Sequence, residues 1–377
     1  MQTNCAYKYR IYPTKEQEVL LAKHFGCVRF VWNYFLNERK EYYLKNKEGL
    51  ETKRTKGSLS YYDNAKQLTL LKKEKEWLKE CNAQSLQASL KHLDNSYKMF
   101  FRKTHKFPNF KSKEVRQSFT IPQHFKLKGK KVYFPKFKDG IKVKKHKKLE
   151  GKFVVATLSR TTTNKYYISI IVEKDINPIS LTDKAIGIDL GIKDLATCSD
   201  GKKYQNIKSL SSLENKLKYK QKQLSRKVKG SNNRKKARHK VAIIHEKIKN
   251  TRNDYIHKIT KAIVNENQVI IAEDLNIKGL MRNHKLAKAI SDVAWHEIHR
   301  QLEYKSKWNG KTYHVIDRFF PSSKMCNTCH FVNDELTLKS RTWNCPNCNT
   351  ELDRDLNASI NILNQGLNNI KAAGIVV

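Results

Sequence analysis

The sequence AIGIDLG occupies residues 185–191 and places a carboxylate, Asp189, directly after a run of residues that begins at Ala185 and is almost wholly apolar. A short run of this kind is typical of a strand buried in a sheet. A charged side chain at the end of such a strand is costly to bury unless it reaches a cleft or a metal ion. Asp189 is therefore the first candidate for a functional carboxylate.

Two further acids stand in comparable places. Glu273 follows four apolar residues in QVIIAEDL, residues 268–275. Asp355 precedes an apolar stripe at helical spacing, which consists of Leu356, Ile360, Leu363, Leu367 and Ile370. Considered alone, Asp355 could equally be the N-cap of that helix. We interpret the neighbouring acids Asp194, Asp274 and Asp353 as caps or as groups that support the site.

The order of elements around these acids predicts their convergence. AIGIDLG, LATCSD and KKYQNI indicate three strands, and a helical pair follows over about residues 209–264. QVIIAEDL is then a strand, WHEIHRQLEYKSKWN a helix, KTYHVIDRFF a strand, and a last helix starts near Asp355. This order predicts an α/β domain of RNase H topology, in which the first strand, the fourth strand and the last helix meet at one cleft.

Three converging carboxylates repel one another unless a cation lies between them. Their oxygen atoms suit Mg²⁺ or Mn²⁺. Two such ions can activate a water molecule and stabilise the leaving oxygen of a phosphodiester. The sequence therefore predicts a metal-dependent nuclease of the RuvC/RNase H type, with Asp189, Glu273 and Asp355 as catalytic residues and as ligands of two ions.

Four of the eight cysteines form two tight pairs with the spacing C-x2-C-x15-C-x2-C, namely Cys326, Cys329, Cys345 and Cys348. This spacing matches the zinc-ribbon pattern, and four thiolates complete a tetrahedral shell with no open position. We expect one structural Zn²⁺ ion, which pins the start of the helix that carries Asp355. The alternative is four reduced thiols without a metal.

The charge of the chain points to a polyanionic partner. Its 377 residues include 76 Lys and Arg against 35 Asp and Glu, a formal net charge of +41. Nucleic acids are the abundant polyanions, and no apolar run approaches the roughly 20 residues that span a bilayer. The start MQTNCAYKYRIYPTKEQ has no apolar core of a signal peptide. We expect a prokaryotic cytoplasmic protein, associated with the nucleoid when bound to DNA.

A basic segment, KLKYKQKQLSRKVKGSNNRKKARHK, runs over residues 216–240. Its charge alone could mean a solvated face or a disordered tail. An intermittent apolar stripe favours a helical hairpin instead, and consists of Leu213, Leu217, Leu224, Val241, Ile244 and Ile248. The outer surface of such a hairpin suits phosphates. We include Arg226, Arg234 and Arg238 among the residues expected to bind nucleic acid.

The first half of the chain has two characters. Residues 14–102 carry apolar residues at helical spacing, whereas residues 105–178 hold short β-branched and aromatic runs punctuated by Gly, Pro and Asn. These runs predict a small antiparallel sheet or barrel. The start, residues 1–15, also reads as a strand.

The motifs GIDLGIKDLAT (187–197), IIAEDLN (270–276), SSKMCNTC…CPNC (322–348) and DRDLNASINIL (353–363) together resemble the TnpB (OrfB) family of insertion sequences. FGCVRFVWNYFLNERK (25–40) also resembles the N-terminal helical region of that family. The three acids match the family carboxylates position by position. His330 and Asn349 replace glycines usual after each cysteine pair, and Ser359 replaces an alanine. Since His and Asn tolerate positive φ, the cysteine turns should survive.

The resemblance implies an RNA-guided DNA endonuclease related to type V CRISPR effectors. A transposon-encoded guide RNA would read a double-stranded DNA target, and the protein would read a short flanking motif. It further implies a wedge β-barrel from residues 1–15 and 105–180, with a helical recognition domain at 16–104. The RuvC-like nuclease domain would comprise 181–320 and 352–377, with the zinc ribbon inserted at 321–351. We expect a monomer.

Residues that would read the flanking motif are Tyr61, Asn64, Gln84 and Gln87, which lie where the recognition domain should face the duplex. Asn and Gln can pair with adenine, and aromatic groups can contact a thymine methyl. Each could equally be a polar residue on a solvated helix face. The alternatives for the whole chain are an RNA-guided repressor without nuclease activity, a transposase or transposition-associated DNA-binding protein, and a guide-independent DNA-binding protein.

Overall fold

The structure is a computed structural model that describes residues 2–51, 59–175, 182–337 and 340–374. The chain divides into two compact units, an N-terminal unit (Gln2–Asp175) and a C-terminal unit that begins at Ile176. Within the described ranges, no helix is both long and apolar enough to cross a membrane.

The N-terminal unit is built on a seven-stranded antiparallel sheet with the order β2-β6-β7-β1-β5-β4-β3. Its strands are β1 (Gln2–Tyr12), β2 (Gln117–Ile121), β3 (Lys126–Lys128), β4 (Lys131–Phe134), β5 (Phe137–Lys144), β6 (Lys152–Arg160) and β7 (Tyr166–Asp175). The start of the chain, β1, pairs with β5 and β7 in the middle of this sheet. Among the described strands the ladder runs from β2 to β3 without closing, which favours the predicted sheet over the predicted barrel.

Helices fill the interval between β1 and β2, as predicted. They are α1 (Lys15–Glu51), α2 (Tyr61–Glu74), the 3-10 helix η1 (Glu76–Glu80) and α3 (Ala83–Phe101). Ser60 and Asp63 form a capping box at the start of α2, and Asn82 caps α3. Phe25 of α1 packs edge to face on Phe119 of β2, with ring centroids 5.2 Å apart.

Parts of the expected domains and loops lie outside the described residues. These parts are residue 1, residues 52–58, residues 176–181, residues 338–339 of the cysteine region and residues 375–377.

The C-terminal unit is built on a five-stranded sheet with the order β10-β9-β8-β11-β12. Its strands are β8 (Ala185–Asp189), β9 (Asp194–Cys198), β10 (Lys203–Gln205), β11 (Val269–Glu273) and β12 (Thr312–Ile316). β11 is parallel to both β8 and β12, whereas β9 is antiparallel to β8 and β10. Each strand overlaps a segment that the sequence predicts as a strand, and β9 begins one residue before its predicted segment.

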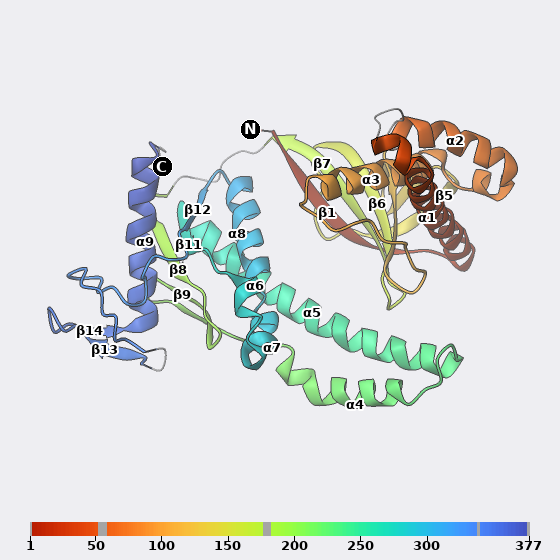
Figure 1. Cartoon of the computed structure of the whole chain (residues 1–377). Coiled ribbons are helices and arrows are strands. Elements are labelled where there is room, and N and C mark those ends of the chain that lie inside the picture. Colours follow the sequence, from red (N-terminus) through yellow and green to blue (C-terminus); the bar gives the residue numbers. More distant parts are fainter. Residues whose placement is uncertain (1, 52–58, 176–181, 338–339, 375–377) are drawn as a thin grey trace. The chain divides into compact units, whose positions relative to one another are not determined.

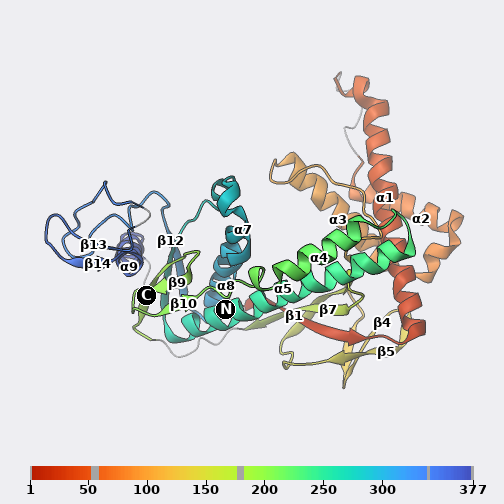
Figure 2. The same ribbon diagram turned by 90° about the horizontal axis from the view of Figure 1, so that it is seen from below.

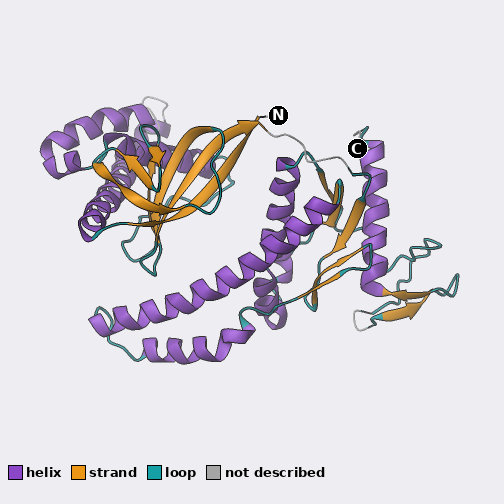
Figure 3. Cartoon of the chain, turned by 180° about the vertical axis from the view of Figure 1, so that it is seen from behind, coloured by secondary structure: helices purple, strands orange, loops and turns teal. Residues whose placement is uncertain are grey.

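Helices cover both faces of this sheet (Figure 1 and Figure 3). On one face lie α5 (Asn232–Glu266), α7 (His284–Val293) and α8 (Trp295–Trp308), whose apolar residues pack on Ile186, Ile188 and Ile270. On the other face, α9 (Arg354–Ala372) packs on Ile271 and its neighbours. The short helix α6 (Ile277–Leu280) and α7 occupy a stretch for which the sequence analysis predicts no element.

Helix α9 lies unusually close to the sheet because glycines remove the side chains between them. A Cβ on Gly187 of β8 would lie 2.1 Å from the carbonyl oxygen of Ser359, and one on Gly366 would lie 2.3 Å from Ile271. Gly187 therefore belongs to the packing of the sheet against α9.

The predicted basic hairpin is confirmed (Figure 2). It consists of the 3-10 helix η2 (Ser211–Leu213), α4 (Glu214–Ser225) and the first half of α5, and α4 and α5 run side by side. The six apolar residues predicted to join the helices all lie in one cluster, whose buried members are Leu217, Val241, Ile244 and Ile248. Burial of this stripe explains why so basic a segment is folded.

Candidate active site

Asp189 and Glu273 are the last residues of two neighbouring parallel strands. Ile188 of β8 is in register with Ala272 of β11, so the next residues along, Asp189 and Glu273, lie at the same edge of the sheet. The strand residues before each acid are mainly buried, whereas both acids are only partly covered. The structure thus brings together the two acids that the strand patterns single out.

Asp355 lies in the first turn of α9, the helix that packs across β8 and β11. The N-cap of this helix is Asp353, whose carboxylate accepts hydrogen bonds from the backbone N–H groups of Asp355 and Leu356 at 3.0 and 2.9 Å. The alternative interpretation of Asp355 as the N-cap is therefore wrong. The carboxylate that caps α9 is that of Asp353, so the carboxylate of Asp355 is not used in the cap.

Electrostatics couple these acids. Burial, together with the negative charges of Asp355 and Glu273, raises the pKa of Asp189 to about 7, against the opposing effects of Arg354 and the Leu190 N–H group. Burial also raises the pKa of Glu273 to about 7, although a hydrogen bond from Ser322 opposes that shift. Carboxyl groups in this state favour a bound cation, and their oxygens suit Mg²⁺ or Mn²⁺. The three acids are thus of the chemical type that binds such ions.

Basic side chains pair with Asp355 and with two acids next to the candidate site in sequence, Asp353 and Asp274. Arg341 lies 3.3 Å from the carboxylate of Asp355, Lys203 lies 2.7 Å from that of Asp353, and Arg318 pairs with Asp274. Arg341 is absent from the sequence-based candidates, because it stands between the cysteine pairs with no periodic pattern around it. Its side chain is 54% exposed, so the guanidinium could also contact a phosphate.

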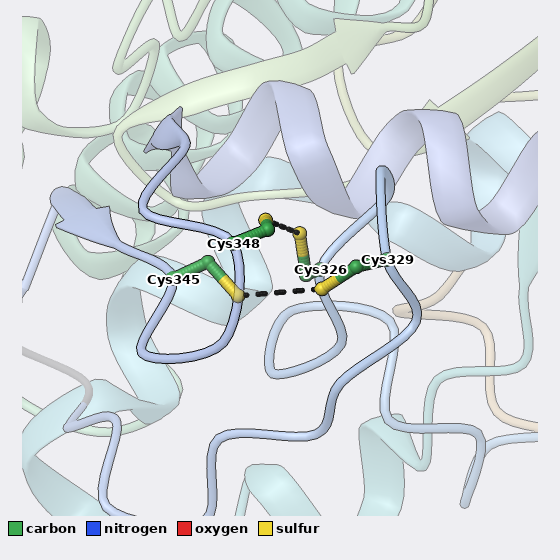
Figure 4. Close-up of side chains that lie close together, drawn as sticks. All are labelled: Cys326, Cys329, Cys345 and Cys348. Atoms are coloured by element: carbon green, nitrogen blue, oxygen red, sulfur yellow. Dashed lines mark hydrogen bonds between the residues drawn. The ribbon is translucent and has the colours of Figure 1, made fainter.

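The four cysteines form the tight metal-ligand cluster found among the described residues. All four sulfur atoms lie within 4.8 Å of one another, and Figure 4 shows them pointing together. Cys326 and Cys348 are 3.7 Å apart between sulfurs, and Cys329 and Cys345 are 3.5 Å apart. With Zn–S bonds of about 2.3 Å, the sulfurs of a tetrahedral site lie about 3.8 Å apart. The arrangement is consistent with a structural zinc site.

Each cysteine pair lies on a tight turn. Backbone hydrogen bonds run from His330 to Cys326 at 3.0 Å and from Asn349 to Cys345 at 2.8 Å. His330 and Asn349 have φ angles of 62° and 56°. The prediction that these two residues tolerate the positive φ of the missing glycines is confirmed. Residues other than glycine seldom adopt a positive φ, and His and Asn are among those that adopt it most readily.

The cysteine segment (residues 322–353) is tied to α9 by buried asparagines. Asn357 donates to the carbonyl of Met325 at 2.7 Å and accepts from the N–H of Asn327 at 2.9 Å. Asn361 donates to the carbonyls of Ser322 and Met325. The hairpin of β13 (Thr342–Asn344) and β14 (Glu351–Asp353) then leads straight into α9. The segment thus holds the helix that carries Asp355.

The residues expected to bind nucleic acid are dispersed. Arg226 is exposed at the end of α4, and Arg238 is partly buried on α5. Arg234 donates to the carbonyls of Leu224 and Lys227 at 3.1 and 2.7 Å, so it closes the turn of the hairpin. Its guanidinium is engaged within the fold.

The four expected motif readers differ in exposure. Gln87 is exposed, whereas Tyr61 and Gln84 are partly buried, and Gln84 donates to Gln123 at 3.4 Å. Asn64 is wholly buried, accepts from Arg39 at 2.6 Å and donates to Gln67 at 3.0 Å. Asn64 therefore braces α2 against α1, and this position corrects the expectation that its amide faces DNA.

Three family profiles match the chain. Residues 168–284 match the OrfB family of IS605 elements, described as "Probable transposase", and residues 295–362 match the "Cas12f1-like, TNB domain". The latter range contains all four clustered cysteines. A third profile, "Helix-turn-helix domain", matches residues 1–48, although β1 and a single long helix occupy this range in the structure.

Curated relatives agree with these profiles. A Streptomyces pristinaespiralis protein named "Putative RNA-guided DNA endonuclease" is 40% identical over 97% of this chain and 90% of its own length. The Escherichia coli K12 protein "Putative RNA-guided DNA endonuclease InsQ" is 31% identical over 96% of this chain and 92% of its own.

A solved structure extends the agreement to the fold. The cryo-EM structure titled "Cas12f1-sgRNA-target DNA complex" superposes with a TM-score of 0.57 at 13% identity, over 96% of this chain and 98% of that one. The chain thus has the fold of a Cas12f1-like protein. Its motifs and relatives are those of the OrfB transposase-associated proteins of insertion sequences, and it belongs to the TnpB family.

Proposed function

We propose that this chain is an RNA-guided DNA endonuclease, with a RuvC-like nuclease domain and one active site formed by Asp189, Glu273 and Asp355. The proposal is carried by the adjacent ends of β8 and β11, which bear Asp189 and Glu273, and by the electrostatic effect of Asp355, at the start of α9, on Asp189. The names of two relatives that match almost the whole chain support the same activity.

The three carboxylates would hold two Mg²⁺ ions, which supply a nucleophilic water at neutral pH and charge stabilisation for the departing oxygen. Ser322 donates to Glu273 at 3.5 Å and orients that carboxylate. Arg341, now paired with Asp355, is free to turn toward a scissile phosphate once cations neutralise the acid. The structural zinc ion would keep the cysteine segment folded and Asp355 in place.

The remaining parts would bind the nucleic acids. In this proposal the sheet of the N-terminal unit is the wedge domain, and α1 to α3 form the recognition domain that faces a flanking DNA motif. The basic hairpin of α4 and α5 would follow phosphates without reading sequence. A net charge of +41 requires a large polyanion to neutralise it, and a guide RNA supplies one. One copy of the chain would suffice.

The test is cleavage of a plasmid by the protein purified with its co-expressed RNA. We expect Mg²⁺-dependent linearisation of a plasmid that carries the matched target and flanking motif. Asp189→Ala should lower the rate at least about 100-fold, the scale on which one electrostatic group acts in an active site. Equal cutting after removal of the RNA, or of an unmatched plasmid, would overturn the guided mechanism.

The family description "Probable transposase" suggests strand transfer as a second candidate. The same assay separates the two, because strand transfer joins a cut DNA end to a second DNA molecule, whereas hydrolysis leaves free 3′ and 5′ ends. Products joined to plasmid DNA would favour the transposase.

A further inference from the structure

The sheet of the N-terminal unit contains a cavity of about 690 Å³ at its β3–β4–β5 end. Four lysines line it, namely Lys126, Lys128, Lys136 and Lys138, and all four are exposed. Phe125 and Tyr133 also line it and are half-buried. The cavity therefore combines flat aromatic surface in its wall with positive charge around it.

Both rings are held in place by neighbouring residues. Phe125 stacks on Phe153 of β6 with ring centroids 5.8 Å apart and planes 5° from parallel. Tyr133 lies over Gly140, where an added Cβ would come within 2.8 Å of the ring. Lys126 also lies over the ring of Tyr133, 6.0 Å from its centroid. Because neighbours already fix both rings, a flat group can pack on them at small entropic cost.

The chemistry of the lining selects the ligand. No carboxylate is among the described residues that line the cavity, so an anion meets no repulsion. A nucleotide offers a flat base for the rings and phosphates for the lysines, and this combination is what single-strand-binding sites use. A duplex cannot use the rings, because its bases are stacked on one another.

We propose that this cavity receives one unstacked nucleotide of the guide RNA, with the base against Phe125 and Tyr133 and the adjacent phosphates among the four lysines. The proposal rests on the proposed function for the identity of the strand. Folded RNA presents unpaired bases in loops and bulges, whereas the flanking DNA is a duplex. The lysines would raise the affinity for the RNA through its phosphates, and the rings would hold one particular nucleotide at this position.

Two sets of variants of the full chain test the cavity, with the dissociation constant of the guide RNA as the measurement. Phe125→Leu/Tyr133→Leu keeps apolar volume but removes the rings, and should weaken RNA binding by roughly 5- to 150-fold, which corresponds to about 1–3 kcal/mol for one stacked base. Lys126→Gln/Lys128→Gln should reduce the slope of log affinity against log salt by about 1.4, or about 0.7 per lost phosphate contact.

Matched controls lie outside the cavity. Tyr62→Leu removes a ring that is 74% exposed on α2, and Lys79→Gln removes a lysine already paired with Glu76. Neither should change RNA affinity more than about twofold. Thermal unfolding of every variant identifies any that fail to fold, and the lysine pair, which is wholly at the surface, keeps the test decisive if the ring variant unfolds.

The outcomes separate this proposal from the proposed function. Unchanged RNA affinity and salt slope in folded variants would overturn the cavity site alone, since wild-type binding and cleavage would remain. Weaker binding of matched DNA to the RNA-loaded protein, with RNA affinity unchanged, would overturn the assignment to RNA. A wild-type chain that binds no guide RNA would overturn both.

Discussion

Asp353 and Asp355 are two residues apart and have different roles. Asp353 uses its carboxylate to cap α9 and to pair with Lys203. Asp355, in the first helical turn, acts electrostatically on Asp189. An acid just after an N-cap is favoured by the helix dipole, so α9 itself lowers the cost of placing a third negative charge at the site.

The raised pKa values make the metal-free site a source of instability at neutral pH. A carboxyl group with a pKa of about 7 in the folded chain and near 4 when unfolded keeps its proton only in the folded chain, so stability falls as pH rises from about 4 to 7. Asp189→Asn removes this loss. In EDTA we expect the variant to exceed wild type by on the order of 2 kcal/mol at pH 8 and by much less at pH 5.

Urea unfolding at the two pH values measures this difference. Asp254→Asn is the control, because Asp254 pairs with Lys258 on the exposed face of α5. A gain for Asp189→Asn that is equal at pH 5 and pH 8 would contradict the assignment of a raised pKa.

At the scale of residues, the surroundings of a candidate side chain are predictable where the local sequence pattern states them. Asp189 and Glu273 follow buried strands, and the cysteines have a spacing that fixes their geometry. The surroundings of Asn64 were not predictable, because no local pattern shows that Arg39, 25 residues earlier, donates a hydrogen bond to its side-chain oxygen. Arg341 was missed for the same reason, because its partner comes close only after the cysteine segment folds.

The close approach of α9 to β8 is an element-scale feature with a sharp prediction. Gly187→Ala places a Cβ 2.1 Å from a backbone oxygen of α9, so the helix must move. We expect a loss of about 3 kcal/mol or more in unfolding free energy, since overpacking costs 1–3 kcal/mol even where neighbours can adjust. Displacement of Asp355 should also abolish nuclease activity.

Gly26→Ala is the matched control in α1, where an added Cβ meets nothing within 4 Å. It should stabilise the chain by about 0.5–1 kcal/mol, because alanine favours a helix over glycine. Denaturant unfolding gives both values. Similar changes in the two variants would contradict the packing explanation.

Element types were largely predictable because the C-terminal strands and the basic hairpin have strong apolar patterns. The helices α6 and α7 follow Glu273 without a comparable pattern, so the sequence predicts neither of them. The sequence also does not decide between an open sheet and a barrel in the N-terminal unit. Closure of a barrel depends on strand curvature and on pairing between strands far apart in the chain.

At the scale of the whole molecule, the zinc site is expected to support catalysis from a distance. The cysteine segment has a small core of Trp343, Leu352 and the cysteines, too small to fold without a metal. Cys345→Ser should lose the zinc equivalent measured by elemental analysis, and nuclease activity should fall with it at any Mg²⁺ concentration. Cys5→Ala, in the buried face of β1, should keep both.

Retention of one zinc per chain by Cys345→Ser would contradict the four-thiolate site. Full activity in a zinc-free variant would instead contradict the role of the asparagine contacts in positioning α9.

The most direct test of the active site compares Asp355→Asn with Asp353→Asn in the RNA-loaded protein, on DNA that matches the guide. Asparagine caps a helix as well as aspartate, so Asp353→Asn should fold and cut at close to the wild-type rate. Asp355→Asn should fold equally well and lose at least about 100-fold in rate, because an amide cannot replace a carboxylate as an Mg²⁺ ligand. Equal cutting by the two variants, or loss only in Asp353→Asn, would contradict the assignment of Asp355 to the active site.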